Sequence, residues 1–310
     1  MSKAIFFDTF LCTACKGCQV ACKTWNNLPS DTGLNQNKFS GSYQNPMELS
    51  HHTRLLMSFN EQSGGSKGVE WAFGRQSCQH CTDAGCVQMC PTGALFHSET
   101  GMVTYDPDVC IGCQRCAAGC TFGVPKYSEI TGKINKCTGC VDRIEYGMAP
   151  ACVTACQSGA LKFGERDEMI ALAEKRVEEL KERGFDKACI YGVDEMDGLH
   201  VIHVLKYGIE AHEQVVNPEL PAMVAATDII KPVTGVLAGV TGLGLAAMFA
   251  LGVGYHRDEM VYNVETEDTI DAETGQVLKH GDGPDTESVK EHILGNLPIG
   301  KNKKGGHDEQ

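Results

Sequence analysis

The sequence predicts an α+β protein with two similar, loop-rich units related by approximate twofold symmetry, followed by one C-terminal transmembrane helix. The first part rests on cysteine, because 16 of the 17 cysteines fall into four quartets between residues 12 and 156. The second part rests on residues 232–255, a run of 24 positions without a charged side chain. The chain therefore divides into a cysteine-rich domain (1–165), a helix-and-strand extension packing on it (166–227), a transmembrane helix (228–256) and an acidic tail (257–310).

The four quartets have spacings that iron–sulfur clusters use. They are Cys12, Cys15, Cys18 and Cys22; Cys78, Cys81, Cys86 and Cys90; Cys110, Cys113, Cys116 and Cys120; and Cys137, Cys140, Cys152 and Cys156. Closely spaced thiolates surround one face of a cubane cluster, whereas the last cysteine tends to serve the other cluster of a pair, as in two-cluster bacterial ferredoxins. The sequence thus predicts two ferredoxin-like two-cluster units.

Approximate twofold symmetry predicts which cysteines share a cluster. The second and third quartets are close in sequence and form one pair, and the first and fourth form the outer pair. The predicted ligand sets are Cys12, Cys15, Cys18 and Cys156 (cluster 1); Cys137, Cys140, Cys152 and Cys22 (cluster 2); Cys78, Cys81, Cys86 and Cys120 (cluster 3); and Cys110, Cys113, Cys116 and Cys90 (cluster 4). Because no quartet lacks a cysteine, we expect four 4Fe-4S clusters, with iron as the only metal.

Two other uses of cysteine are less consistent with the spacing. Paired CxxC units also bind zinc, but three cysteines in CxxCxxC succession crowd too many thiolates onto one loop for a single tetrahedral ion. Disulfide frameworks belong to short secreted domains, whereas this chain has 310 residues and can bury a core of its own. A zinc-binding interaction protein remains a remote alternative.

The cysteine motifs also carry a family resemblance. Four runs resemble the iron–sulfur (beta) subunit of membrane-bound respiratory formate dehydrogenases: CTACKGCQVACKTWNNLP (12–29), CQHCTDAGCVQMCPTGAL (78–95), CIGCQRCAAGC (110–120) and KCTGCVDRIEYGMAPACVTACQSGAL (136–161). The likeness continues through 168–192 and 198–205. Many molybdopterin oxidoreductases and some hydrogenases use the same four-cluster subunit, so a role in one of those complexes is the alternative. The region after the last quartet makes formate dehydrogenase the better match.

The resemblance implies a non-catalytic electron-transfer subunit. Its expected partners are a catalytic alpha subunit with a molybdenum or tungsten pterin, and a gamma subunit, a membrane cytochrome b that reduces quinone. It also implies a location in the cytoplasmic (inner) membrane, with the clusters in the periplasm and the C-terminus in the cytoplasm. The residues themselves show no phosphate loop, nucleophile elbow or non-cluster metal motif, which agrees with relay rather than catalysis.

A helix and a short strand are expected after the last quartet. From Asp167 to Arg183 apolar residues recur at helical spacing, at Met169, Ala173, Val177 and Leu180, and Gly184 supplies a stop. Residues 200–207 are rich in Val, Ile and Leu, which indicates a strand. His200 and His203 have no partner at ligand spacing, and we interpret them as structural.

The uncharged segment 232–255 is long enough to cross a bilayer. At about 1.5 Å per residue it forms a helix of roughly 36 Å, compared with a hydrocarbon core of about 30 Å. The alternative is a buried Gly/Ala-rich core helix. Gly235, Gly239, Gly242 and Ala246 fall on one helical face, and such a face lets another transmembrane helix approach closely. We therefore expect this face to contact the membrane subunit.

Charge excludes one class of partner. The net charge is −13, of which residues 257–310 contribute −7 (6 basic and 13 acidic residues), and this acidic balance argues against nucleic acid. Several cations lie beside cysteines, where a positive charge would favour the reduced cluster or would simply be a surface charge: Lys16, Arg115, Lys126, Lys136 and Arg143. Trp25 is expected to pack against a cluster, and 23–77 is expected to be an ordered loop.

Overall fold

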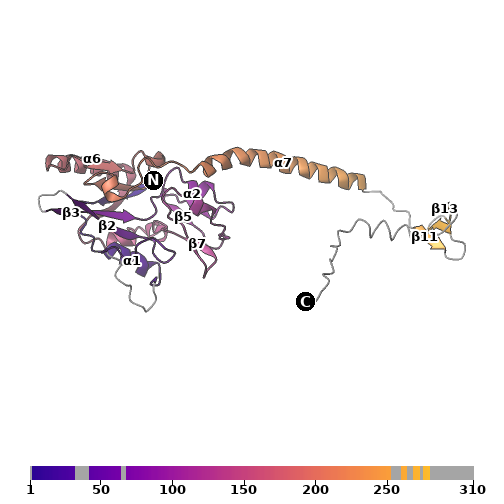
Figure 1. Ribbon diagram of the computed structural model, residues 1–310, viewed down its shortest axis with the longest axis horizontal. Helices are drawn as coiled ribbons and strands as arrows, with labels where there is room; N and C mark the ends of the chain where they lie inside the picture. Colours follow the sequence, from indigo (N-terminus) through magenta and orange to yellow (C-terminus); the bar gives the residue numbers. More distant parts are fainter. Residues whose placement is uncertain are drawn as a thin grey trace, which may run out of the picture. The chain divides into compact units, whose positions relative to one another are not determined.

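The computed structural model describes residues 2–31, 42–63, 68–252, 260–263, 268–272 and 275–279. The chain forms two compact units, residues 1–234 and 235–310. All 17 cysteines lie in the first unit, whose helices and strands are seen in Figure 1. The first unit therefore holds the predicted cysteine-rich domain, the whole of the extension that follows it, and the first residues of the predicted membrane helix.

A four-stranded sheet joins the N-terminus to the extension. Its order is β8 (Leu161–Glu165), β1 (Lys3–Asp8), β10 (Val201–Leu205) and β9 (Cys189–Tyr191). β1 is parallel to β10, with Ile5 opposite Val201, and antiparallel to β8, with Ile5 opposite Phe163. β10 is antiparallel to β9. The predicted strand at 200–207 is confirmed as β10.

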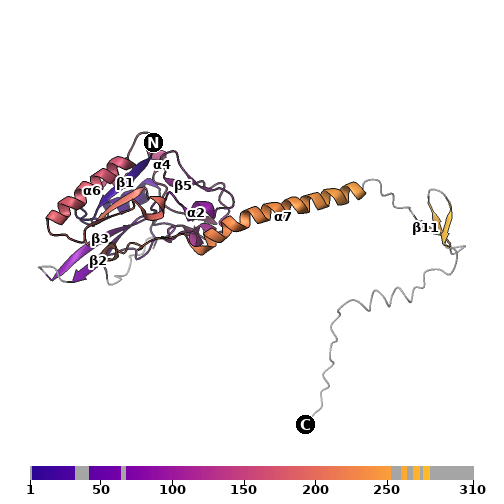
Figure 2. The ribbon, with the colours of Figure 1, turned by 90° about the horizontal axis from the view of Figure 1, so that it is seen from above.

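The two faces of the sheet cover different parts of the core. Side chains alternate along a strand, so Ala4 and Phe6 of β1 pack with helix α6 (Arg166–Glu182), which runs along the sheet in Figure 2. Ile5 and Phe7 pack on the other side with the cysteine core. Helix α6 buries Met169, Ala173, Val177 and Leu180, as the periodicity predicts, and Gly184 follows it with φ +91°.

Short helices and hairpins carry the cysteines. The helices are α1 (Gly17–Trp25), α2 (Gly85–Gln88), α3 (Arg115–Ala118), α4 (Val141–Glu145) and α5 (Ala151–Thr154). Helix α1 packs on α5 and α2 packs on α3, so the first quartet meets the fourth and the second meets the third. Two small hairpins accompany them, β4 (Leu95–His97) with β5 (Val103–Tyr105) and β6 (Lys126–Ser128) with β7 (Lys133–Asn135). Short 3₁₀ turns lie at Glu195–Asp197 and Glu210–His212.

The expectation of a loop over 23–77 is wrong for its second half. Strands β2 (Leu56–Ser63) and β3 (Val69–Gln76) form an antiparallel hairpin with Phe59 opposite Phe73. Phe59, Trp71 and Phe73 contact one another at ring-centroid distances of 5.4–6.0 Å, and such cross-strand aromatic pairs stabilise a hairpin. Residues 32–41 and 64–67 of this segment lie outside the described residues.

The C-terminal part contains a long helix and a small sheet. Helix α7 spans Ala222–Gly252, so it begins before the predicted position 228, and residues 253–256 lie outside the described residues. Positions 238–251 are all exposed. Within the described part of the chain, we find no helix with the length and apolar character that crossing a membrane requires.

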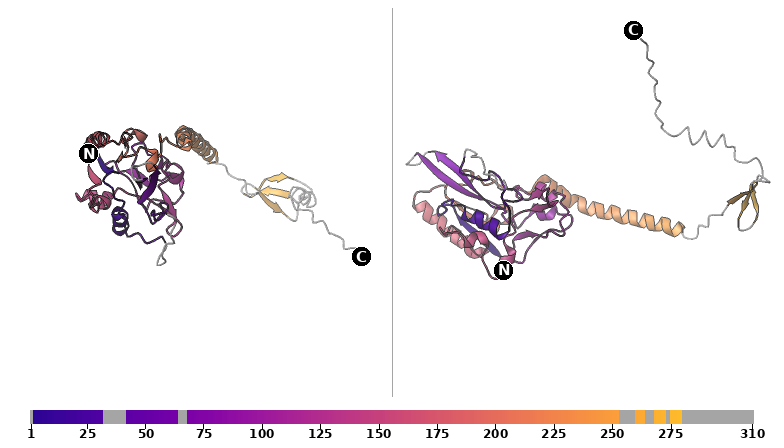
Figure 3. Two further views of the ribbon diagram at one scale, coloured as in Figure 1. Left: turned by 60° about the vertical axis from the view of Figure 1, so that its left-hand side comes forward. Right: turned by 90° about the horizontal axis from the view of Figure 1, so that it is seen from below.

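The acidic tail contains strands that the sequence did not predict. β11 (Met260–Asn263), β12 (Asp268–Asp271) and β13 (Val277–Lys279) form an antiparallel sheet, whose strands lie side by side in Figure 3. The rest of the predicted tail, from residue 280, lies outside the described residues.

Candidate metal centres

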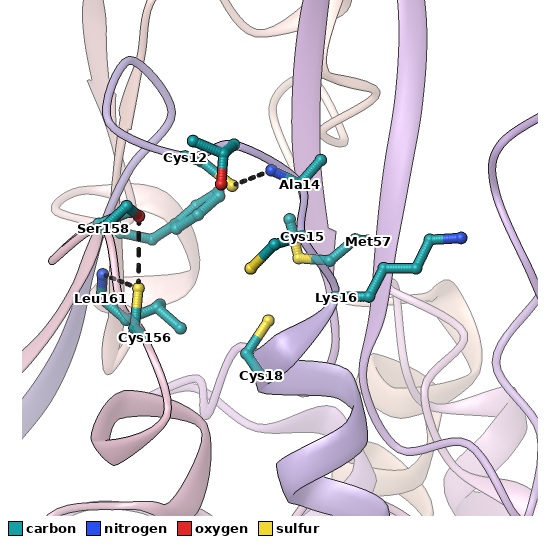
Figure 4. Close-up of a pocket in the computed structure, with 12 residues that line it drawn as sticks. Cys12, Ala14, Cys15, Lys16, Cys18, Met57, Cys156, Ser158 and Leu161 are labelled. Carbon is teal, nitrogen blue, oxygen red and sulfur yellow. Dashed lines mark hydrogen bonds between the residues drawn. The ribbon is translucent and has the colours of Figure 1, made fainter.

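The first group of cysteines lines one pocket. Cys12, Cys15, Cys18 and Cys156 lie around it with the apolar side chains of Phe7 and Met57. Figure 4 shows Cys12 and Cys15 on the loop before α1, Cys18 in the first turn of α1, and Cys156 just after α5, around a common space. These are the four residues predicted to bind cluster 1, and the fold brings them together from positions more than a hundred residues apart.

Polar hydrogens point at the sulfur atoms of this group. The amide of Ala14 donates to Cys12 Sγ at 3.4 Å, and the amide of Leu161 donates to Cys156 Sγ at 3.3 Å. Ser158 Oγ also lies 3.7 Å from Cys156 Sγ. Hydrogen bonds of this kind stabilise negative charge on sulfur and help to set the potential of a bound cluster.

The second group is enclosed by protein. Cys22, Cys137, Cys140 and Cys152 are all buried. Burial raises the pKa of Cys22, and the neighbouring Cys137, Cys152 and Cys140 thiolates raise it further. Burial, together with the neighbouring Cys137, Cys152 and Asp142, raises the pKa of Cys140 to about 12. Because thiols must lose their protons to bind iron, occupation of this group releases protons.

Cys137 differs from the other members of its group. Burial would raise its pKa, but a hydrogen bond with His80 and the positive charges nearby lower it to about 7. His80 Nε2 lies 3.6 Å from Cys137 Sγ, and His80 Nδ1 lies 3.0 Å from the Val103 carbonyl oxygen. Cys137 is therefore the thiol of this group that forms a thiolate most readily.

The third and fourth groups form one core around α2 and α3. Burial raises the pKa of Cys81, and so do its neighbours Cys78, Cys120 and Cys86. Burial likewise raises the pKa of Cys116 to about 11, together with Cys90, Cys110 and Cys113. These neighbours include the fourth cysteine predicted from the other quartet, Cys120 for Cys81 and Cys90 for Cys116. The assignment of ligands to the individual clusters stays a prediction.

The cysteine loops share a backbone feature. Ala14, His80, Gly112 and Gly139 each lie two residues after the first cysteine of a quartet, and all four have positive φ values of 50° to 72°. This conformation turns the chain so that successive cysteines can face one centre, and it strains residues other than glycine. A Cβ on Gly112 would lie 2.0 Å from the Gly132 carbonyl oxygen. The four quartets are thus structural repeats as well as sequence repeats.

The donor set fits clusters rather than separate ions. In a 4Fe-4S cluster each thiolate binds a different iron, so the four sulfurs lie farther apart than the ligands of one ion. Among the residues that the structure describes, no three His, Cys, Asp or Glu side chains lie close enough to hold a single metal ion. The histidines singled out in the sequence bond to protein: His200 Nδ1 to the Lys3 carbonyl at 2.6 Å, and His203 Nε2 to Gln79 Oε1 at 3.0 Å.

Two residues near the cysteines differ from what the sequence indicates. Trp25 is 44% exposed, so its ring is not enclosed beside a cluster as the sequence suggests. Its indole N–H donates to Asp142 Oδ2 at 2.9 Å, and the Arg143 guanidinium lies 4.3 Å from its ring centroid. Arg75 is fully buried beside the cysteines, although the cysteine motifs do not include it. No sequence signal marks it, since its burial depends on the β2–β3 hairpin.

Comparison with known families defines the class. Residues 11–94 and residues 69–166 each match a family described as a 4Fe-4S dicluster domain. Two dicluster matches account for four clusters, the number that the cysteine groups provide. The fold and its sites therefore define an electron-transfer protein with four 4Fe-4S clusters.

Full-length relatives identify the family. The chain is 36% identical over 266 residues to the formate dehydrogenase, nitrate-inducible, iron-sulfur subunit of Escherichia coli, covering 86% of this chain and 87% of the relative. It is 38% identical over 248 residues to the formate dehydrogenase iron-sulfur subunit of Haemophilus influenzae, covering 78% of each. The B subunit of the anaerobic dimethyl sulfoxide reductase of E. coli is 36% identical over 166 residues, covering 53% of this chain and 74% of the relative. The chain belongs to the family of formate dehydrogenase iron–sulfur subunits, and its role is electron transfer, not catalysis.

Proposed function

We propose that this chain is the electron-transfer subunit of a membrane-anchored formate dehydrogenase complex. Electrons from formate, oxidised at a molybdenum or tungsten pterin in an alpha subunit, pass through the four clusters to a membrane cytochrome b and quinone. The observation that carries the proposal is the convergence of sixteen cysteines into four groups within one compact unit. The family relationship with formate dehydrogenase subunits supports the choice of donor.

Solvent exposure distinguishes the ends of the electron path from its middle. Cys15 of the first group and Cys113 of the fourth are exposed. All ligands predicted for cluster 2 are buried, as are Cys78 and Cys86 of cluster 3. Electrons enter and leave a protein where a redox centre approaches its surface, so clusters 1 and 4 are the exchange points and clusters 2 and 3 connect them.

Contacts at the start of α7 support a direction for the path. Val224 is fully buried, and a Cβ on Gly85 would lie 3.3 Å from Val224 Cγ2. Thr227 Oγ1 donates to Met89 Sδ at 3.1 Å. The start of α7, which belongs to the first unit, therefore packs beside α2, between Cys86 and Cys90. We place clusters 3 and 4 nearer the membrane and cluster 1 nearer the catalytic subunit.

The anchor of this proposal is the uncharged run at 232–255. It includes residues beyond the described ones, and its support is the absence of charge in the sequence and the helical conformation of its described part, residues 232–252 of α7. We place the protein in the cytoplasmic membrane with a single pass, the cluster domain in the periplasm and the C-terminus in the cytoplasm. This orientation follows the family resemblance.

One substitution tests the anchor and its contact face. Gly239→Leu should release the membrane subunit in mild detergent, because leucine would prevent close approach of a second helix. Gly244→Leu is the matched control, since Gly244 lies outside the small-residue face of Gly235, Gly239, Gly242 and Ala246, and both glycines have open space around them in this chain. Co-purification measures the outcome, and equal retention of the subunit by both variants would refute this assignment.

A second candidate function is the same type of subunit in another molybdopterin oxidoreductase or in a hydrogenase, which the similarity to a dimethyl sulfoxide reductase subunit favours. Purification of the native complex through this chain separates the two. A partner that contains a molybdenum or tungsten pterin and reduces dyes with formate supports the proposal. A partner that responds to hydrogen, or oxidises reduced dyes with dimethyl sulfoxide, supports the second candidate.

A further inference from the structure

A buried arginine lies in the middle of the cluster domain. Arg75, the penultimate residue of β3, has no exposed surface. Among the described residues no carboxylate pairs with it, since the ion pairs of the first unit involve Lys3, Lys23, Lys133 and Arg176. A buried charge is costly unless it is paired and hydrogen-bonded. Arg75 therefore requires an anionic neighbour that the carboxylates of the described chain do not provide.

The hydrogen bonds of Arg75 are incomplete within the protein. Its Nη1 donates to Ser77 Oγ. Nε and Nη2 are buried without an oxygen or nitrogen acceptor, and the side chain that the guanidinium addresses besides Ser77 is the Cys152 thiol. The ionisable groups that act most strongly on the guanidinium are the thiols of Cys152, Cys137 and Cys18. Two of these belong to the set Cys22, Cys137, Cys140 and Cys152. These donors thus face the predicted position of cluster 2, whose sulfur atoms accept hydrogen bonds.

Lys136 and His80 extend the polar core toward the next cysteine group. Lys136 is 1% exposed and donates to the carbonyl oxygens of Val103 at 2.6 Å and Cys137 at 2.8 Å. Its Nζ lies 3.9 Å from Cys78 Sγ, a predicted ligand of cluster 3. Positive groups therefore border both middle clusters. By contrast, Arg115, beside a ligand of cluster 4, is exposed.

We propose that Arg75 is a positioning residue that donates hydrogen bonds to cluster 2 and raises its reduction potential. A reduced cluster carries one more negative charge than an oxidised one, so a fixed positive charge in a low-dielectric interior favours reduction. An exposed cation such as Arg115 is screened by water and salt and has a smaller effect. This inference rests on the cluster assignment made above and adds a specific role for Arg75.

The test is a potentiometric titration of the purified complex followed by electron paramagnetic resonance. Arg75→Gln removes the charge, Arg75→Lys keeps it, and Arg115→Gln is the control for loss of an exposed charge near a ligand. We expect Arg75→Gln to lower the midpoint potential of one cluster, Arg75→Lys to restore most of it, and Arg115→Gln to leave that cluster unchanged. Four intact clusters with unshifted potentials in Arg75→Gln would overturn the proposal.

The proposal can still be tested if the Arg75→Gln variant does not assemble all of its clusters. If Arg75→Gln lacks a cluster, the iron content and potentials of Arg75→Lys are decisive. Full iron content with near-native potentials supports a role for the charge, whereas loss of the same cluster from both variants shows a packing role and overturns the proposal. Absence of all iron–sulfur signals from the unaltered complex would instead contradict the proposed function.

Discussion

The middle of the cluster domain and its two ends differ in how deeply the cysteines are buried and in which charged groups surround them. Around the predicted cluster 2 every cysteine is buried, and Arg75, Lys136 and His80 supply positive charge or hydrogen-bond donors from the interior. At the ends, Cys15 and Cys113 reach the surface. The middle is insulated and electrostatically compensated by this chain alone. The ends are open, which fits sites completed by partner subunits.

Replacement of a cluster ligand should show the largest difference in stability between the buried middle and the exposed ends. Cys152→Ser and Cys113→Ser should each remove one cluster, about a quarter of the bound iron. Because Cys152 belongs to the main hydrophobic core with Ile5 and Phe7, its variant should also lower the thermal midpoint and the yield of complex. Iron analysis and thermal unfolding measure both effects. Equal losses of stability in the two variants would contradict the claim that the buried cysteines contribute more to folding stability than the exposed ones.

Neighbouring aromatic residues in β1 sharpen the same comparison. Phe6 and Phe7 are 2% and 1% exposed and face opposite sides of the sheet. Replacement of either by alanine should cost about 3–5 kcal/mol. Only Phe7→Ala opens the pocket of Cys12, Cys15, Cys18 and Cys156, so only this variant should lose its cluster absorbance faster in air. Identical bleaching rates would show that Phe7 does not protect cluster 1.

The repeated turn in the cysteine loops allows a smaller test. Gly112 and Gly123 have φ values of +68° and +60°, but only Gly112 has a backbone atom in the way of a Cβ. Gly123→Ala should cost about 1–2 kcal/mol, the usual penalty of this conformation. Gly112→Ala should cost more and lower the occupancy of the cluster bound by Cys110, Cys113 and Cys116. Thermal midpoints and iron content compare them, and equal effects would exclude the clash as the cause.

Features encoded locally could be predicted from the sequence. The cysteine spacing predicts four groups, and the period of Met169, Ala173, Val177 and Leu180 predicts helix α6 with its buried face. The exchange of fourth cysteines between quartets follows from the assumed symmetry, and the packing of α1 on α5 and α2 on α3 agrees with it.

Features that depend on contacts between residues far apart in the sequence could not be predicted. Strand β1 pairs with β10, which begins nearly two hundred residues later, and no local pattern specifies that partner. The burial of Arg75 depends on the β2–β3 hairpin, whose strands lie within a segment rich in Asn, Ser and Gly that favours a loop by composition. Trp25 looks like a core residue, but its indole N–H finds a partner at the surface.

The most direct test of the central claim is reduction of the clusters by formate in the detergent-solubilised native complex, kept anaerobic and followed by electron paramagnetic resonance. We predict that formate alone produces signals of reduced 4Fe-4S clusters and that added quinone removes them. If dithionite reduces the clusters but formate does not, the four-cluster path stands and the assignment to a formate dehydrogenase complex is wrong.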